Sequence, residues 1–90
     1  MIAPQRRLLP SIASLRALEA LDRLGSATAA AEELNQTQSA VSRQLQALEA
    51  QLGTDLIIRE RKVMRLTPAA VDYAATVRAA LQSIAQASLK

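Results

Sequence analysis

The segment 26–52 constrains the fold more than any other part of the chain. It opens with a stretch whose small apolar residues share one face of a short helix, namely Ala30, Ala31 and Leu34. Asn35 follows, a residue type that tolerates the left-handed backbone conformation in which helices end. Thr37 then provides an N-cap for a second helix. Two helices joined by so short a turn are typical of a helix-turn-helix, and the alanines of the first helix allow the two to cross closely.

The second helix of this pair, predicted over residues 38–52, has one apolar and one polar face. The apolar residues recur at spacings of four, three and four: Val41, Leu45, Leu48 and Leu52. The opposite face is polar and contains no acid: Gln38, Ser39, Ser42, Arg43 and Gln46. Such a face offers the donors and acceptors that read base edges in the major groove of DNA. An ordinary solvated helix face is the alternative interpretation of these residues.

Three motifs in this region carry a resemblance to a known family. They are A-A-x-x-L from Ala30, T-Q-S-A-V-S-R-Q from Thr37 and A-L-E-x-Q-L-G from Ala47. Together they resemble the DNA-binding domain of LysR-type transcriptional regulators, and the resemblance covers roughly residues 15–84. It implies a bacterial transcription regulator that binds an inverted-repeat operator in double-stranded DNA as a homodimer, with the helix 38–52 in the major groove.

The chain departs from the family's pattern at several positions. The family commonly has Phe at the positions of Leu18, Ala27 and Ile57, an aliphatic residue at Gln36, Arg at Lys62 and Gly at Ala70. Most of these changes fall in the predicted core and leave the predicted DNA-reading face unchanged. Lys62 keeps the positive charge but lacks the guanidinium fork that arginine presents.

The N-terminal residues 1–10 contain two prolines and the pair Arg6 and Arg7, and they predict an extended, flexible basic arm. Two interpretations of this arm stay open. It is either a solvated tail or an arm that contacts DNA phosphate or the minor groove.

A first helix is predicted from a cap at Ser11 or Ser14 to about residue 24. Its predicted buried stripe consists of leucines and alanines: Leu15, Ala17, Leu18, Ala20, Leu21 and Leu24. Gly25 supplies the helix stop, and Ser26 caps the next helix, with Thr28 as the alternative cap. The N-termini of the two following helices, near Ser26, Thr28 and Thr37, also offer backbone N–H groups to DNA phosphates.

Two short aliphatic runs, 56–58 and 63–66, predict the strands of a hairpin. The charged segment Arg59-Glu60-Arg61-Lys62 lies between them, and the pattern L-x-x-R-x-x-K-x-x-x-L-T resembles the wing of the same family. We therefore expect Arg59, Arg61 and Lys62 to contact a DNA groove or phosphate, with a solubilising turn as the alternative. The predicted fold of residues 11–66 is a mostly α winged helix-turn-helix: a three-helix core plus a short two-stranded wing.

A long helix is predicted for residues 67–90, capped by Thr67 and begun by Pro68. Its apolar seam steps by three and four residues: Ala70, Tyr73, Val77, Leu81, Ile84 and Ser88. A helix of about 20 residues is about 30 Å long, more than so small a domain can cover, which predicts that another chain covers part of the seam. The resemblance implies a linker helix that pairs antiparallel with its twin, and we expect the dimer interface at Tyr73, Val77, Leu81 and Ile84. It also implies a tetramer in a full-length protein and a small-molecule effector bound by a further C-terminal domain, with no cofactor in this one.

Composition restricts the remaining functions. The chain has no Cys and no His, which excludes disulfides and thiol catalysis and argues against a zinc site. Its two glycines, Gly25 and Gly53, cannot make a phosphate-cradling loop, so we do not expect an enzyme. One Tyr and no Phe or Trp leave little for stacking on single-stranded bases.

The charge balance suits a polyanionic partner, with 11 Lys and Arg against 8 Asp and Glu and a net charge of +3. No run of the sequence has the length of a membrane span, and no signal-peptide core stands at the N-terminus. We therefore expect a cytoplasmic, nucleoid-associated protein with no membrane partner. The competing function is a helical dimerisation or protein-interaction module that does not bind DNA.

Overall fold

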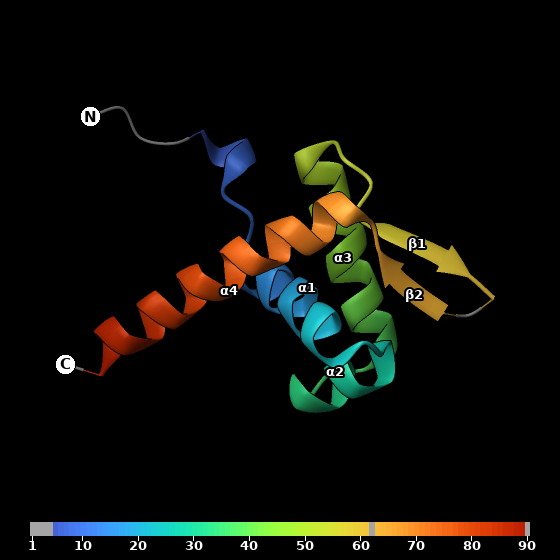
Figure 1. Ribbon diagram of the computed structural model, residues 1–90, viewed down its shortest axis with the longest axis horizontal. Helices are drawn as coiled ribbons and strands as arrows, with labels where there is room; N and C mark the ends of the chain where they lie inside the picture. Colours follow the sequence, from blue (N-terminus) through green and yellow to red (C-terminus); the bar gives the residue numbers. More distant parts are fainter. Residues whose placement is uncertain (1–4, 62, 90) are drawn as a thin grey trace.

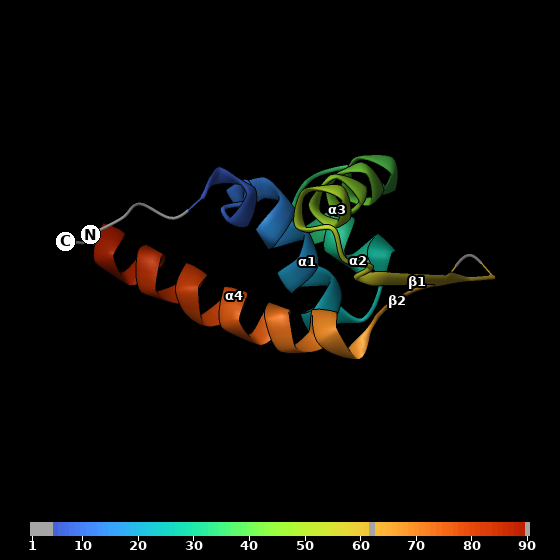
Figure 2. The same cartoon turned by 90° about the horizontal axis from the view of Figure 1, so that it is seen from above.

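The described residues form four α-helices, one turn of 3-10 helix and a β-hairpin, which confirms the predicted mostly α winged helix-turn-helix (Figure 1). The computed structural model describes residues 5–61 and 63–89. In chain order the elements are η1 (Arg6–Leu8), α1 (Ile12–Leu24), α2 (Ala27–Glu33), α3 (Gln38–Leu52), β1 (Ile57–Glu60), β2 (Val63–Leu66) and α4 (Pro68–Ser88). Figure 2 shows α1 between α3 on one side and α4 on the other, with the hairpin and the C-terminal end of α4 at opposite ends of the molecule.

A serine or threonine caps each of the four α-helices. The capping residues are Ser11, Ser26, Thr37 and Thr67, and each side-chain oxygen accepts the backbone N–H three residues on. A cap of this kind contributes about 1 kcal/mol to the stability of its helix. The N-cap of α1 is therefore Ser11 and not Ser14, and the N-cap of α2 is Ser26 and not Thr28.

The turn between α2 and α3 is closed by two backbone hydrogen bonds around Asn35. Asn35 has a φ of 57°, the left-handed conformation expected from the sequence. Its N–H donates to the carbonyl of Glu32 at 3.1 Å, and the N–H of Gln36 donates to the carbonyl of Ala31 at 2.9 Å. This pair of bonds satisfies the carbonyls that the end of α2 leaves free. The turn consequently needs only the residues between Glu33 and Gln38.

The core lies mainly between α1 and α3. Its largest fully buried side chains are Leu18, Val41, Leu45 and Leu48. Each contributes about 1.5–3 kcal/mol by leaving water. Alanines on the neighbouring helices, Ala31, Ala70 and Ala74, complete the cluster. Ala31 of α2 is one of the alanines for which the sequence predicts a close crossing with α3. Leu24 departs from the predicted stripe and is 37% exposed, because it lies in the last turn of α1, where Gly25 turns the chain away from the core.

The hairpin is tighter than the sequence predicts. The strands are antiparallel, with Glu60 paired to Val63, so Arg59 and Glu60 belong to β1 and not to the tip. Leu56, predicted as part of the strand, precedes it and is buried. Arg61 has a φ of 46°, the positive value that two-residue hairpin turns require. Lys62 lies outside the described residues.

The N-terminal segment differs from the extended arm that we expected. Arg6–Leu8 form one turn of 3-10 helix against the C-terminal part of α3 (Figure 1). The side-chain Nε2 of Gln51 donates to the carbonyl oxygens of Arg6 and Arg7, at 3.2 and 3.3 Å. These bonds tie residues 6–8 to the body of the domain, since the glutamine amide of α3 donates to two carbonyls of this segment. Residues 1–4 lie outside the described part of the chain.

Helix α4 crosses α1 with its first half and extends past it with its second (Figures 1 and 2). Its buried residues are Ala70, Ala74 and Val77, and every described residue from position 82 onward is exposed. Within residues 5–61 and 63–89, no helix combines the length and the apolar character needed to cross a membrane.

Candidate nucleic-acid interface

The N-terminal half of α3 has a polar outer face and an apolar face that is buried in the core. Val41 and Leu45 face the core and are fully buried. The predicted reading residues lie on the outer side: Gln38, Ser39, Arg43 and Gln46 are exposed, and Ser42 is half-buried. The core contacts of α3 therefore fix the helix while its first turns remain free to meet a partner.

The wing lies beside this polar surface. Arg59 of β1 donates from its guanidinium to the hydroxyl of Ser42 on α3, at 3.4 Å. Behind them, the Glu49 carboxylate of α3 accepts the backbone N–H groups of Leu56 and Ile57, at 2.9 and 3.0 Å. Hydrogen bonds to a charged acceptor are the stronger kind. They fasten the start of the wing to the helix it accompanies.

The helix N-termini that we expected to face phosphate differ in how their hydroxyls are used. The hydroxyls of Ser26 and Thr37 accept the N–H groups of Ala29 and Ala40, at 3.2 and 3.0 Å, and so act as caps. Thr28, which is exposed, instead accepts a hydrogen bond from the Nε2 of Gln38 at 2.9 Å. The sequence offered no signal for this contact, since the two residues lie ten positions apart on different helices.

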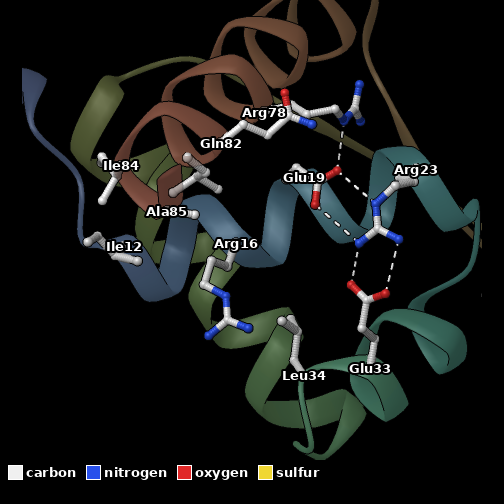
Figure 3. Close-up of a pocket in the computed structure, with 11 residues that line it drawn as sticks. Ile12, Arg16, Glu19, Arg23, Glu33, Leu34, Arg78, Gln82, Ile84 and Ala85 are labelled. Carbon is white, nitrogen blue, oxygen red and sulfur yellow. Dashed lines mark hydrogen bonds and ion pairs between the residues drawn. The ribbon is translucent and has the colours of Figure 1, made fainter. Parts of the chain in front are cut away.

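Five charged side chains, Glu19, Asp22, Arg23, Glu33 and Arg78, link α1 with α2 and α4. Figure 3 shows the Arg23 side chain between Glu19 and Glu33. Arg23 pairs with Glu33 of α2 through two contacts and with Glu19 at 3.0 Å. Arg78 of α4 pairs with the same Glu19 at 2.8 Å and with Asp22 at 2.7 Å. Burial alone would raise the pKa of Glu19, but the hydrogen bonds from Arg23 and Arg78 outweigh it and lower that pKa below its ordinary value.

The arginines on the surface of α3 and the wing mostly lack acidic partners. Among the described residues, Arg43, Arg59 and Arg61 form no ion pair. Arg65 of β2 pairs with Glu60 at 3.3 Å, where both side chains are largely exposed and the pair contributes little. Arg6, Arg7 and Arg16, which are exposed, likewise form no ion pair among the described residues, so the positive charge available to an anionic partner lies along α3 and the wing and also on η1 and α1.

The residues of the predicted dimer seam on α4 differ in burial: some pack inside the chain and others are exposed. Val77 is only 5% exposed and packs within its own chain, because the small Ala70 and Ala74 let α4 lie close to α1. Tyr73 is half-buried against the same core, and burial raises the pKa of its hydroxyl. Leu81 is half-buried, and Ile84 is 53% exposed.

A groove of about 470 Å³ runs between α1, the end of α2 and the second half of α4. Its apolar lining comes from Leu81, Ile84, Ile12, Leu34 and Ala85 (Figure 3). The sequence analysis did not identify Ile12 as part of an apolar surface. The spacing of four and seven residues to Arg16 and Glu19 puts Ile12 on the same face of α1 as these two residues, which also line the groove. Within the described ranges, no three Asp or Glu side chains come close enough to hold a metal ion.

A three-helix body whose third helix has a polar outer face, with a hairpin beside it, defines a winged helix-turn-helix domain. The family model for the bacterial regulatory helix-turn-helix proteins of the lysR family matches residues 12–71, and the chain belongs to that family.

Relatives of known name and structure agree with this assignment. TrpI of Pseudomonas aeruginosa, an HTH-type transcriptional regulator, is 48% identical over 65 residues, which are 72% of this chain and 22% of TrpI. Among solved structures, the complex of the CbnR DNA-binding domain with DNA has a TM-score of 0.75 and 32% identity, covering 83% of this chain and 86% of that one. The probable transcriptional regulator PA0477 of Pseudomonas aeruginosa has a TM-score of 0.79 and 34% identity, covering 91% of this chain and 27% of that one. The chain thus spans about a fifth of the length of TrpI.

Proposed function

We propose that this chain binds double-stranded DNA in a sequence-specific way, as the DNA-binding domain of a transcription regulator. The observation that carries the proposal is the contact between Arg59 and Ser42, which holds the basic wing beside the acid-free polar face of α3. A surface of this form fits a duplex, with the helix in the major groove and the wing on the flanking backbone or minor groove. The similarity to the CbnR domain, whose structure was solved with DNA, supports it.

The first turns of α3 read the bases in this proposal. Gln38 carries an amide whose donor and acceptor suit the N7 and N6 of adenine. Ser39 is small enough to let the helix backbone approach the groove, and Ser42 lies one turn further on the same face. Arg43 is long enough to reach either a guanine or a phosphate, and these two roles have different consequences for specificity. Gln46, one turn after Ser42, lies at the edge of the contact.

The surrounding residues hold phosphate. Arg59 and Arg61 extend from the wing, and Lys62, outside the described residues, continues the basic stretch in the sequence. The exposed start of α3 at Thr37 supplies backbone N–H groups that the helix itself leaves unpaired. Backbone N–H groups at the start of α2, near Ser26 and Thr28, would face a second phosphate, while the Thr28 hydroxyl itself accepts a hydrogen bond from Gln38. These contacts fix the position of the domain without carrying sequence information.

The chain acts as a homodimer on an inverted-repeat operator in our proposal. Since Val77 is buried and Tyr73 packs against the core within the chain, we place the dimer contact at Leu81, Ile84 and the apolar lining of the groove beside them. In a longer protein, a further domain would bind the effector and a tetramer would form. The expected cytoplasmic, nucleoid-associated location follows from DNA binding.

The test is the salt dependence of binding to duplex DNA, measured by fluorescence anisotropy with the intact chain. We expect the logarithm of the binding constant to fall linearly with the logarithm of salt concentration, by about 0.9 per phosphate contacted. Single strands of the same sequence should bind more weakly, because the chain has one Tyr and no other aromatic residue on which bases could stack. A protein-interaction module, the competing function, would bind duplex DNA weakly and without this steep salt slope.

A further inference from the structure

The hydrogen bond between Gln38 and Thr28 spans the turn of the helix-turn-helix. Gln38 is the first residue of α3, and Thr28 lies in the first turn of α2. The Gln38 Nε2 donates to the Thr28 hydroxyl oxygen at 2.9 Å, and both residues are exposed. The side chain at the very start of the predicted reading surface is therefore held by a neighbouring helix before any partner is bound.

The constraint matters because a glutamine amide has two chemically different ends. Its carbonyl oxygen accepts hydrogen bonds, and its NH₂ group donates two. In an exposed glutamine the terminal torsion has broad, roughly two-fold preferences, so oxygen and nitrogen readily exchange places. A free amide consequently presents both orientations to a base edge, and each orientation matches a different pattern of donors and acceptors.

Thr28 restricts this freedom. In the structure its hydroxyl oxygen accepts one N–H of Gln38, so the side chain is held and the nitrogen end of the amide lies toward α2. The second N–H and the carbonyl oxygen remain free. One donor beside one acceptor is the pattern that pairs with the N7 and N6 of adenine in the major groove.

We propose that Thr28 is a positioning residue for sequence specificity, which orients the Gln38 amide for adenine. This inference rests on the proposed DNA-binding function and deepens it. Thr28 acts through Gln38 and not as a phosphate contact in its own right. The backbone supports this geometry, since the Asn35 and Gln36 hydrogen bonds close the turn between the two helices that carry Thr28 and Gln38.

The experiment measures base preference position by position, on variants of a site selected from random duplexes. Thr28→Val removes the hydroxyl at nearly constant shape, and Thr28→Ser keeps it as the matched control. We expect Thr28→Val to relax the preference by about two- to tenfold, the range of one exposed hydrogen bond, at the base pair where Gln38→Ala also relaxes it. Thr28→Ser should retain the preference, and Thr28→Val should add nothing in a chain that already carries Gln38→Ala.

Three results would overturn the role of Thr28. A uniform loss of affinity across all sequences with a smaller salt slope would make Thr28 a phosphate contact. An effect of Thr28→Val that persists in the Gln38→Ala background, or an unchanged preference, would separate the two residues. Thr28→Ala provides a second variant should the branched valine disturb α2, and circular dichroism reports the helix content of each. If the wild-type chain shows no preference at any position, the proposed function itself fails, which is a different outcome from these three.

Discussion

Gln36 places a polar group in the turn of the helix-turn-helix where an apolar one should be more stable. Its backbone N–H closes the turn on Ala31, but its side-chain Oε1 is buried and has no hydrogen-bond partner among the described residues. In a turn of this type, the residue at this position usually makes an apolar contact with the end of the preceding helix. The pattern of the lysR family likewise has an aliphatic residue there. We therefore predict that Gln36→Leu stabilises the fold.

The magnitude follows from the unpaired oxygen. A buried acceptor without a partner costs about 1–3 kcal/mol. Since the rest of the Gln36 side chain is only half-buried, we expect the lower part of that range, a gain of about 1–2 kcal/mol. In a domain of this size each kcal/mol corresponds to about 4–8 °C in the unfolding temperature.

Thermal and urea unfolding, followed by circular dichroism at one fixed protein concentration, measure the change. Gln46→Leu is the matched control, because Gln46 lies on an exposed face of α3 and the same substitution there should alter stability by less than about 0.5 kcal/mol. A Gln36→Leu variant no more stable than the wild type would mean that water satisfies the Oε1 atom in solution, so that the buried oxygen carries no penalty.

Three further changes test the dimer, the wing and the charged cluster on α1. Leu81→Asp puts a charge in the groove beside α4 and should shift the proposed dimer to monomer in sedimentation; an unchanged dimer would place the interface elsewhere. Arg59→Ala should reduce the salt slope of DNA binding by about 0.9 for each phosphate that Arg59 holds in each half-site, whereas Arg65→Ala, already paired with Glu60, should change it less; equal effects would refute the distinction. The lowered pKa of Glu19 means that its stabilisation is present above its ordinary value of 4.5 and disappears as the pH falls through the folded-state pKa. The stability difference between wild type and Glu19→Gln, measured in urea, should therefore shrink between about pH 7 and pH 3, and a constant difference would contradict the assignment.

The local signals in the sequence predicted the helices and turns well. Ser26, Thr37 and Thr67 were recognised as caps, and Asn35 as a left-handed residue, because the chemistry of a cap or turn involves only neighbouring positions. The predicted ends of α3 at residues 38 and 52 are confirmed. The hairpin was placed less accurately, since the pairing of Glu60 with Val63 depends on a φ of 46° at Arg61, a conformation that arginine seldom adopts.

The arrangement of side chains on the surface was harder to predict. The periodicity of α4 identified one apolar seam but could not divide it between the chain's own core and a partner, and so Val77 was assigned to the dimer although it is buried in the monomer. The contacts of Gln38 with Thr28 and of Arg59 with Ser42 depend on how the helices and the wing cross. No spacing in the sequence encodes those crossings, so only the structure reveals which reading residues are held in place.

The most direct test of the proposed DNA-binding mode is the change in base preference caused by Gln38→Ala. If the N-terminal half of α3 lies in the major groove, this variant should lose about 1–3 kcal/mol on the selected site and relax the preference at one base pair in each half-site. Arg43→Ala, measured alongside, should do the same at another base pair if Arg43 reads a base, or weaken all sequences alike if it holds phosphate. If neither substitution alters affinity or preference, α3 does not lie in the groove and the proposed mode of binding is wrong.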